Sequence, residues 1–406
     1  MKYAVLVGDG MADYPIAELD NRTPLEAAKT PNMDAIVRLG LLGEARTIPV
    51  HMPPASDVAN LSILGYDPQK YYTGRGPLEA ASLGIELGNN DIAFRCNLVT
   101  VKDGTMSDYS AGHISTEEAR ALIDHLNKEL ARDDLRFYCG VSYRHLLVIK
   151  AAADGLQHIH LQRTNCSPPH DIVGEQISEH WPHGTGSELL IELTQRSTDI
   201  LTAHPINQAR VQNGKSPANM IWLWGQGRRP SLPTYRDKFH LSGGVISAVD
   251  LIKGLGKLLG LQVVNVPGAT GYYDTNYKGK AAAAKDVLQG TDFVFVHVEA
   301  PDEAGHNGDL EEKIKAIERF DAHIVGEILH TLQGYNDFRL LVLPDHPTPL
   351  SVRTHTREPV PFALAGKGIS SSGFSSFTEK EAHGSHIIFA NGYKLAEAFL
   401  NPAHTF

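Results

Sequence analysis

Short apolar runs that stop abruptly on polar residues recur along this 406-residue chain. The runs over 3–7, 292–300 and 340–343 are almost uninterrupted, which is typical of strands buried on both faces. Between such runs, apolar residues recur at helical spacing over 30–40, 277–288 and 311–331. This alternation predicts an α/β fold with a largely parallel sheet.

Weaker patterns add elements to both ends of the chain. They predict strands over 45–50 and 261–266 and a helix over 245–259. Ser56 follows two prolines and precedes a helical pattern, so it occupies the position of a helix N-cap. Asp9 precedes a glycine at the end of the first strand, where an Asx turn is the ordinary interpretation.

The middle of the chain has a different pattern of predicted elements. A strand over 91–101 enters a hairpin turn, a capped amphipathic helix covers 115–129, and further strands are predicted over 137–149 and 156–161. Strands and helices mixed in this way predict an α+β domain inserted into the first one. We expect one domain formed by 1–85 and 236–406 and an inserted domain at 86–235.

Composition narrows the class of protein. A chain of this length exceeds the usual single core, and 42% hydrophobic with 21% charged residues is typical of a soluble globular protein. The net charge of -10 argues against a general nucleic-acid surface. No apolar run suits a signal peptide or a membrane span, and three cysteines without a CxxC pair fit a reducing compartment. We therefore expect a cytoplasmic protein with neither nucleic-acid nor membrane partners.

Histidine is the unusual component, because 20 residues are about twice the average usage. Several follow strand ends together with carboxylates: Asp9, Asp302 with His306, Asp345 with His346, and His355. Open α/β sheets build their sites at the carboxyl ends of strands. Mixed carboxylate and imidazole ligands suit Zn, Mn or similar ions, so the pattern predicts a binuclear metal centre.

Such a centre gives Ser56 a second interpretation beside the N-cap. Two divalent ions clamp the oxygens of a phosphoryl transfer, and the N-terminus of a helix favours a phosphate carried on a serine oxygen. Ser56 is therefore also a candidate nucleophile that forms a phosphoserine.

Several long motifs resemble one known family. They are 8–11, 55–67, 74–80, 141–145, 299–306, 344–349 and 353–356. The chain resembles the archaeal-type 2,3-bisphosphoglycerate-independent phosphoglycerate mutases of the alkaline phosphatase superfamily. The resemblance implies an alkaline-phosphatase-like doubly wound α/β sheet with an inserted α+β domain, and an enzyme that interconverts 3-phosphoglycerate and 2-phosphoglycerate through a phosphoserine.

The resemblance also implies that 1–85 and 236–406 form a metal-binding, phosphatase-like domain and that 86–235 form a substrate-binding (transferase) domain. It further implies residue roles. Ser56 is the nucleophile and a ligand of one metal, together with Asp9, Asp345 and His346; the other metal is bound by Asp302, His306 and His355. His383 and His386 are the competing candidates for the place given to His355. The two ions are divalent (Mn, Zn or Mg), and the sequence leaves their identity and the oligomeric state open.

Six residues in family-like motifs are the candidates for binding the phosphoglycerate: Arg75, Arg95, His113, Arg144, His170 and Asp171. A phosphate-and-carboxylate substrate needs such cationic and polar groups. Trp222 and Trp224 are interpreted as packing residues instead.

Three alternatives remain open. A branch of the family with the motifs at 110–115 and 353–356 is associated with homoserine kinase activity, although the chain has no GxxxxGK[ST] and no kinase glycine loop. A metal-dependent phosphatase would use the same centre. A binding protein that has lost turnover is the non-enzymatic alternative.

Overall fold

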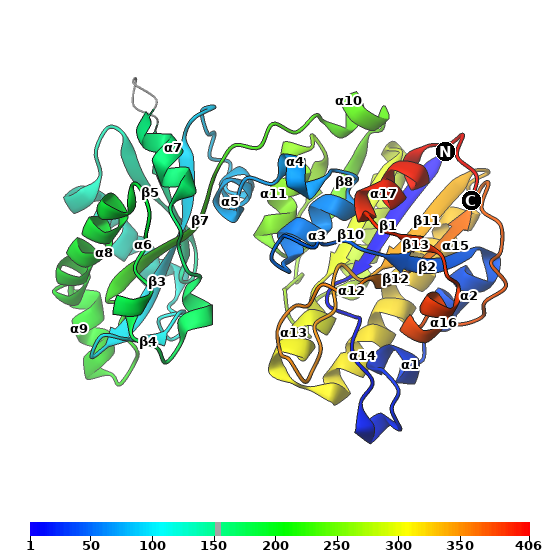
Figure 1. Cartoon of the computed structure of the whole chain (residues 1–406), viewed down its shortest axis with the longest axis horizontal. Helices are drawn as coiled ribbons and strands as arrows, with labels where there is room; N and C mark the ends of the chain where they lie inside the picture. The colour runs from blue at the N-terminus through cyan, green and yellow to red at the C-terminus, as the bar shows by residue number, and fades with distance from the viewer. Residues whose placement is uncertain (151–155) are drawn as a thin grey trace. The chain divides into compact units, whose positions relative to one another are not determined.

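The computed structural model describes residues 1–150 and 156–406, which form two compact units (Figure 1). Unit 1 comprises Met1–Tyr72 and Leu232–Phe406, and unit 2 comprises Thr73–Ser231. The expected boundaries at 85/86 and 235/236 lie later in the chain than these divisions. The difference at the first boundary is helix α5 (Arg75–Ser82), which packs on strands of unit 2.

Unit 1 is built on an eight-stranded sheet of order β13-β2-β12-β11-β1-β10-β8-β9. The strands are β1 (Lys2–Gly8), β2 (Leu41–Ala45), β8 (Gly243–Ile246), β9 (Gln262–Val264), β10 (Phe293–Val298), β11 (Phe338–Leu343), β12 (Val360–Gly366) and β13 (Ile388–Phe389). Strand β1 lies between β10 and β11 and is parallel to both, whereas β12 pairs with β11 antiparallel. The carboxyl ends of β11, β1 and β10 therefore meet at one edge.

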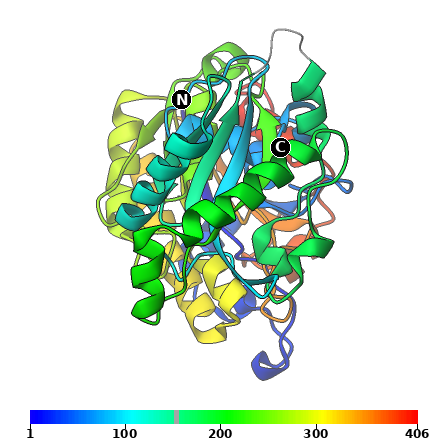
Figure 2. The same cartoon turned by 90° about the vertical axis from the view of Figure 1, so that its left-hand side faces the viewer.

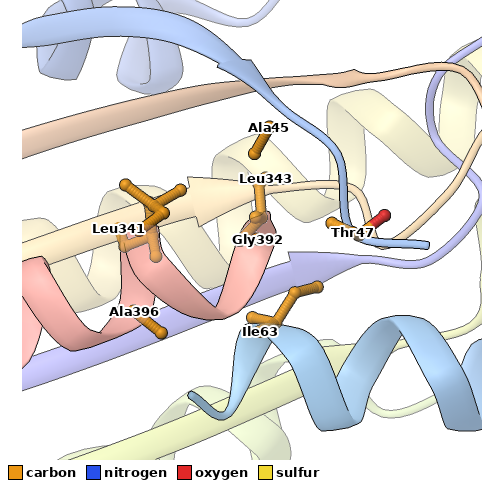
Figure 3. A pocket seen from close by; sticks show the side chains of 8 residues that line it. Ala45, Thr47, Ile63, Leu341, Leu343, Gly392 and Ala396 are labelled. Carbon is orange, nitrogen blue, oxygen red and sulfur yellow. The ribbon is translucent and has the colours of Figure 1, made fainter. Parts of the chain in front are cut away.

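Helices cover both faces of this sheet. In β11, Leu340 and Val342 join the core formed with α2 (Pro31–Leu39), α12 (Tyr277–Gly290), α14 (Leu310–Phe320) and α15 (Gly326–Gln333). The alternate residues Leu341 and Leu343 face α3 (Ser56–Ile63) and α17 (Gly392–Leu400), as Figure 3 shows. The small gap there is almost wholly apolar and leaves no room for a water molecule. Because successive side chains of a strand point to opposite faces, the continuous apolar runs form a sheet buried on both sides.

Shorter elements complete unit 1: η1 (Ala17–Leu19), α1 (Pro24–Ala27), α4 (Pro68–Tyr71), α10 (Tyr235–Phe239), α11 (Asp250–Leu258), α13 (Ala300–Asn307), η4 (Asp321–Val325) and α16 (Glu379–Gly384). The π-helical turn η4 joins α14 to α15, so the long helix expected over 311–331 is continuous. The carboxylate of Asp321 accepts hydrogen bonds from the backbone N–H groups of Asn32 and Met33, which caps α2. The cap of α2 thus comes from a distant part of the sequence.

Unit 2 is built on an antiparallel sheet of order β4-β3-β6-β5. Strand β7 also pairs with β3, on the side opposite to β6. Its elements are β3 (Ile92–Lys102), β4 (Thr105–Asp108), β5 (Leu135–Val141), β6 (Arg144–Ile149), β7 (Met220–Arg228), α5, α6 (Thr116–Leu130), α7 (Leu156–Arg163), η2 (Pro169–Ile172), η3 (Ile177–Glu179), α8 (Ser187–Thr202) and α9 (Pro205–Gln212). Helices α6 and α8 lie side by side over one face (Figure 2). The predicted α/β fold with an inserted α+β domain is confirmed.

Three local predictions are wrong. The strand expected over 45–50 is β2, which starts at Leu41 and ends at Ala45, because it follows directly on the end of α2 at Gly40. The helix expected over 245–259 is divided into β8 and α11, since Gly243–Ile246 pairs with β10. The strand expected over 156–161 is helix α7, since an apolar alternation of six residues fits either state. Among the described residues, every helix is too short or too polar to cross a bilayer.

Candidate metal centre

The candidate ligands of unit 1 converge at the carboxyl ends of three adjacent strands. Asp9 follows β1, while Asp345 and His346 follow β11. After β10 the chain passes directly into α13, which carries Asp302 and His306 four residues apart. This helical spacing brings the ring Nε2 of His306 to 3.2 Å from Asp302 Oδ2.

Asp9, Asp345 and His346 form one group of possible ligands. The Nε2 of His346 lies 3.5 Å from Asp9 Oδ1 and 3.5 Å from Asp345 Oδ2. The Asp345 carboxylate is held on its other sides by the backbone N–H of Gly10 at 3.1 Å and by Asn60 Nδ2 at 2.7 Å. Its orientation is therefore fixed by the protein.

Asp302, His306 and His355 form the second group. His355 Nε2 lies 3.0 Å from His306 Nε2 and 3.5 Å from Asp302 Oδ1. Possible ligand atoms of Asp302, His355 and His346 also lie within 4.8 Å of one another, so His346 stands between the two groups. Of the competing candidates, His383 instead contacts Glu44, at 3.2 Å from Nδ1.

Ser56 lies at the start of α3, and the N-cap itself is Ala55. The interpretation of Ser56 as the N-cap is therefore wrong. Its Oγ lies 3.1 Å from His346 Nε2 instead of accepting a hydrogen bond from the first turn of α3. Asn60, which the sequence did not single out, donates to both the backbone oxygen of Ser56 and the Asp345 carboxylate, tying α3 to β11.

The electrostatics of these groups fit a bound cation. Burial and the nearby Asp345 and Asp302 raise the pKa of Asp9 well above its usual range. Its Oδ1 is buried without a hydrogen-bond partner among the described residues. At Gly10, whose φ of 61° suits glycine, a Cβ would stand 2.5 Å from Asp302 Oδ1, so any side chain at this position would clash with the candidate ligand. Crowded buried carboxylates of this kind are compensated by a metal ion.

The imidazoles are suited to the same role. Burial lowers the pKa of His346 to about 4, against the opposing charge of Asp345, so the ring is neutral and offers a lone pair at neutral pH. Burial opposes ionisation of Asp302, but the charges of His355 and His306 outweigh it and hold the Asp302 pKa well below its usual range. Burial opposes protonation of His306, but Asp302 outweighs it and raises the His306 pKa to about 9, so a cation bound there would displace that proton. Carboxylates and neutral imidazoles are the ligand types of Zn and Mn sites.

Sequence reasoning missed a second row of polar residues behind the centre. His297 and Glu299 lie in and just after β10, and Lys280 of α12 donates to Glu299 at 2.8 Å. All three side chains are buried. A signal was present, because His297 and Glu299 interrupt the apolar run over 292–300 at alternate positions.

In unit 2, three candidate substrate residues lie around Trp224. The Nε atoms of Arg75 and Arg95 each lie 3.1 Å from a different oxygen of Glu79. The Arg95 guanidinium stands 4.5 Å from the centroid of the Trp224 ring, and the His170 ring packs edge-on at 5.2 Å. Trp224 is thus buried, as expected for a packing residue, and also orients the arginine.

The other three candidates extend the same cluster. Asp171 lies 3.7 Å from His170 Nε2. His113 packs against Tyr143 with ring centroids 6.1 Å apart, and the Arg144 guanidinium lies 5.6 Å from the same ring. Tyr109 contacts both Tyr143 and His170 edge-on, so all six residues belong to one group of cationic and aromatic side chains.

The fold and site together define an α/β protein that has a candidate metal centre at one sheet edge and carries an inserted α+β unit. A family model described as 2,3-bisphosphoglycerate-independent phosphoglycerate mutase matches residues 38–207. A protein of that name from Methanosarcina acetivorans is 57% identical over 365 residues, covering 90% of each chain. A probable member from Geobacter sulfurreducens is 51% identical over 406 residues, covering 99% of this chain and 100% of its own.

Solved structures agree with these relatives. A protein from Pyrococcus horikoshii shares 30% identity at a TM-score of 0.82, covering 100% of this chain and 98% of its own. The cofactor-independent phosphoglycerate mutase from Thermoplasma acidophilum shares 28% identity at a TM-score of 0.64, covering 98% and 99%. The chain belongs to the 2,3-bisphosphoglycerate-independent phosphoglycerate mutase family, and it is therefore an enzyme of the isomerase class. The family membership predicted from the sequence is confirmed.

Proposed function

We propose that this enzyme interconverts 3-phosphoglycerate and 2-phosphoglycerate through a phosphoserine formed on Ser56. The observation that carries the proposal is the position of the Ser56 hydroxyl, 3.1 Å from Nε2 of His346, the imidazole that lies close to both groups of candidate ligands. A serine at a helix N-terminus is well placed to carry a phosphate, because free N–H groups and the helix dipole favour negative charge there.

Two divalent cations complete the proposed site. Asp9, Ser56, Asp345 and His346 would hold one, and Asp302, His306 and His355 would hold the other, with His346 close enough to both groups to contact either ion. When bound, such ions lower the pKa of a coordinated hydroxyl and neutralise charge on a transferring phosphoryl group. Mn or Zn suits this mixture of ligands best.

The transfer would take two steps. The Oγ of Ser56 loses its proton and forms a bond to the phosphorus of 3-phosphoglycerate, the bond from phosphorus to the C3 oxygen breaks, and that oxygen takes up the proton. The C2 hydroxyl then loses its proton and attacks the phosphorus of the phosphoserine, the bond from phosphorus to Oγ breaks, and Oγ takes up the proton, which restores Ser56. Water must be kept from the phosphoserine between the steps, or hydrolysis would replace isomerisation.

We assign substrate recognition to the cationic cluster of unit 2. Arg95 is buried beneath Trp224 and shares Glu79 with Arg75, so both guanidinium groups are held in fixed orientations. Oriented guanidinium groups bind carboxylates and phosphates through paired hydrogen bonds. His113, Arg144, His170 and Asp171 would supply further polar contacts from the same cluster.

Single-turnover analysis with labelled 3-phosphoglycerate tests the reaction. We expect 2-phosphoglycerate without inorganic phosphate, and a phosphorylated peptide containing Ser56 after acid quench. Release of inorganic phosphate alone would instead establish a phosphatase. Phosphorylation of homoserine by ATP, without phosphoglycerate interconversion, would establish the kinase alternative.

We also infer a cytoplasmic location. Cys96, Cys139 and Cys166 are all free thiols, as expected in a reducing compartment. Fractionation of cells, with this enzyme followed by immunoblot, tests the inference; recovery in an extracytoplasmic fraction would contradict it.

A further inference from the structure

A buried polar row lies behind the candidate metal centre and consists of Lys280, Glu299 and His297. The exposed fractions of their side chains are 0%, 4% and 1%. Charged and polar groups this deeply buried are costly unless they are paired, so the row needs an explanation. None of the three residues is a proposed metal ligand.

The base of the row is fully anchored. Glu299 accepts hydrogen bonds from Lys280 Nζ at 2.8 Å, from Ser247 Oγ at 2.8 Å and from the backbone N–H of Ala248 at 3.1 Å. Lys280 also donates to the backbone oxygen of His297 at 2.9 Å. Glu299 in turn lies 3.2 Å from His297 Nδ1, which fixes the plane of that ring.

The other end of the His297 ring faces the metal centre. Its Nε2 lies 3.4 Å from Asp9 Oδ2 and 3.8 Å from Asp345 Oδ2, and it has no hydrogen-bond partner among the described residues. The two oxygens of Asp9 therefore face different residues. Oδ1 faces His346, whereas Oδ2 faces His297.

We propose that His297 is a positioning residue for the metal centre: its ring, anchored by Glu299 and Lys280, lies against the carboxylates of Asp9 and Asp345 and limits the orientations that they can adopt. Because the ring occupies the side of Asp9 Oδ2, it leaves Asp9 Oδ1 directed at the site. The inference rests on the proposed two-metal centre and adds residues that the ligand sets do not contain.

Manganese binding to the metal-free enzyme tests this role without any substrate. We expect the wild-type protein to bind two Mn²⁺ ions in an isothermal titration. His297→Asn should weaken one of them roughly 10- to 100-fold, as is usual when a residue that orients ligands is removed. The site formed by Asp302, His306 and His355 should keep its affinity. Mn²⁺ affinity unchanged at both sites would overturn the proposal.

Glu299→Gln is the second variant and keeps the His297 ring while weakening its anchor. It should reduce the affinity of the same ion, and it decides the matter if His297→Asn fails to fold. The matched control is His145→Asn, since His145 of unit 2 is also buried with an Nε2 that has no hydrogen-bond partner among the described residues. That control should leave both manganese sites unchanged.

Thermal unfolding of the metal-free variants separates positioning from mere stability. Variants that lose thermal stability but retain both manganese affinities would show a purely structural role and would overturn the proposal. Failure of the wild-type protein to bind manganese, zinc or magnesium would overturn the two-metal centre itself. The two failures are therefore distinguishable.

Discussion

The two units carry polar clusters of opposite character. In unit 1, the carboxylates of Asp9, Asp302 and Asp345 lie close together beside the imidazoles of the candidate centre. One oxygen of Asp9 is left without a hydrogen-bond partner among the described residues. In unit 2, Arg75 and Arg95 share the single carboxylate of Glu79 and pack on an aromatic ring. One cluster has an excess of anionic ligands, and the other has an excess of guanidinium groups.

This difference fits the roles that we propose for the two units in a reaction on a phosphorylated acid. Buried groups of like sign are costly to fold, so each cluster is suited to a ligand of the opposite sign. The acid-rich cluster suits cations that act on a phosphoryl group, and the arginine-rich cluster suits the anionic substrate. Changes in one cluster should therefore leave the ligand of the other unaffected.

Ser56→Ala should have the largest effect, because it removes the proposed nucleophile. We expect mutase activity to fall by roughly four orders of magnitude or more, as when other enzymes lose a nucleophile. Ser62→Ala is the matched control, since Ser62 is a buried serine on the same helix. Coupled assays of 2-phosphoglycerate formation measure both. Substantial activity in the Ser56 variant would remove the phosphoserine from the mechanism.

Chelation should abolish activity and destabilise unit 1 selectively. An ion present at 100 times its dissociation constant contributes about 2.7 kcal/mol to stability. All three tryptophans, Trp181, Trp222 and Trp224, lie in unit 2, so tryptophan fluorescence reports on that unit while circular dichroism reports on both. We expect EDTA to lower the midpoint temperature of unfolding followed by circular dichroism more than the midpoint followed by fluorescence. Addition of manganese should reverse this shift. A shift confined to the fluorescence transition would contradict the assignment.

Arg95→Met tests the opposite cluster. Removing one member of the charge pair that Arg95 is proposed to form with the substrate should cost about 2–5 kcal/mol, which corresponds to a loss of roughly 30- to 4000-fold in kcat/KM. Arg95→Lys should recover little, because lysine lacks the planar fork that packs on Trp224. Arg136→Met is the control, since Arg136 is an exposed arginine near Tyr138 in the same unit. Metal content should stay at the wild-type value in all three variants. A loss of bound metal would contradict the expectation that the two clusters bind their ligands independently.

The pH dependence that we expect from His145 concerns stability alone. Burial lowers the pKa of His145 to about 3, below the ordinary 6.5. The folded protein therefore binds this proton less readily than the unfolded chain, so stability is complete above pH 6.5 and is lost as the pH falls. The loss should reach about 3 kcal/mol by pH 4. Urea unfolding followed by tryptophan fluorescence at pH 7 and pH 4 should show a weaker pH dependence in His145→Asn than in the wild type. An equal pH dependence in the two proteins would show that groups other than His145 cause the loss of stability.

Long regular segments were predictable from the sequence because local pattern decides them. The apolar runs that became β1, β10 and β11, and the helices α2, α12 and α14 with α15, have one hydrophobic period and clear ends. Short segments were not predictable. Gly243–Ile246 became a strand because β10 offered it a partner, and α7 took a helical form that its alternation did not indicate.

The ligand types of the candidate metal centre were also in the sequence, because acids and histidines stand where strands end. Only the tertiary structure decided how they combine: that the Ser56 hydroxyl points to His346 instead of capping α3, that Asn60 bridges two ligand segments, and that His297 faces Asp9 from behind. The physical reason is distance along the chain. Asp9, Ser56, His297 and Asp345 are far apart in sequence and meet only because parallel β1, β10 and β11 end at one edge of a sheet.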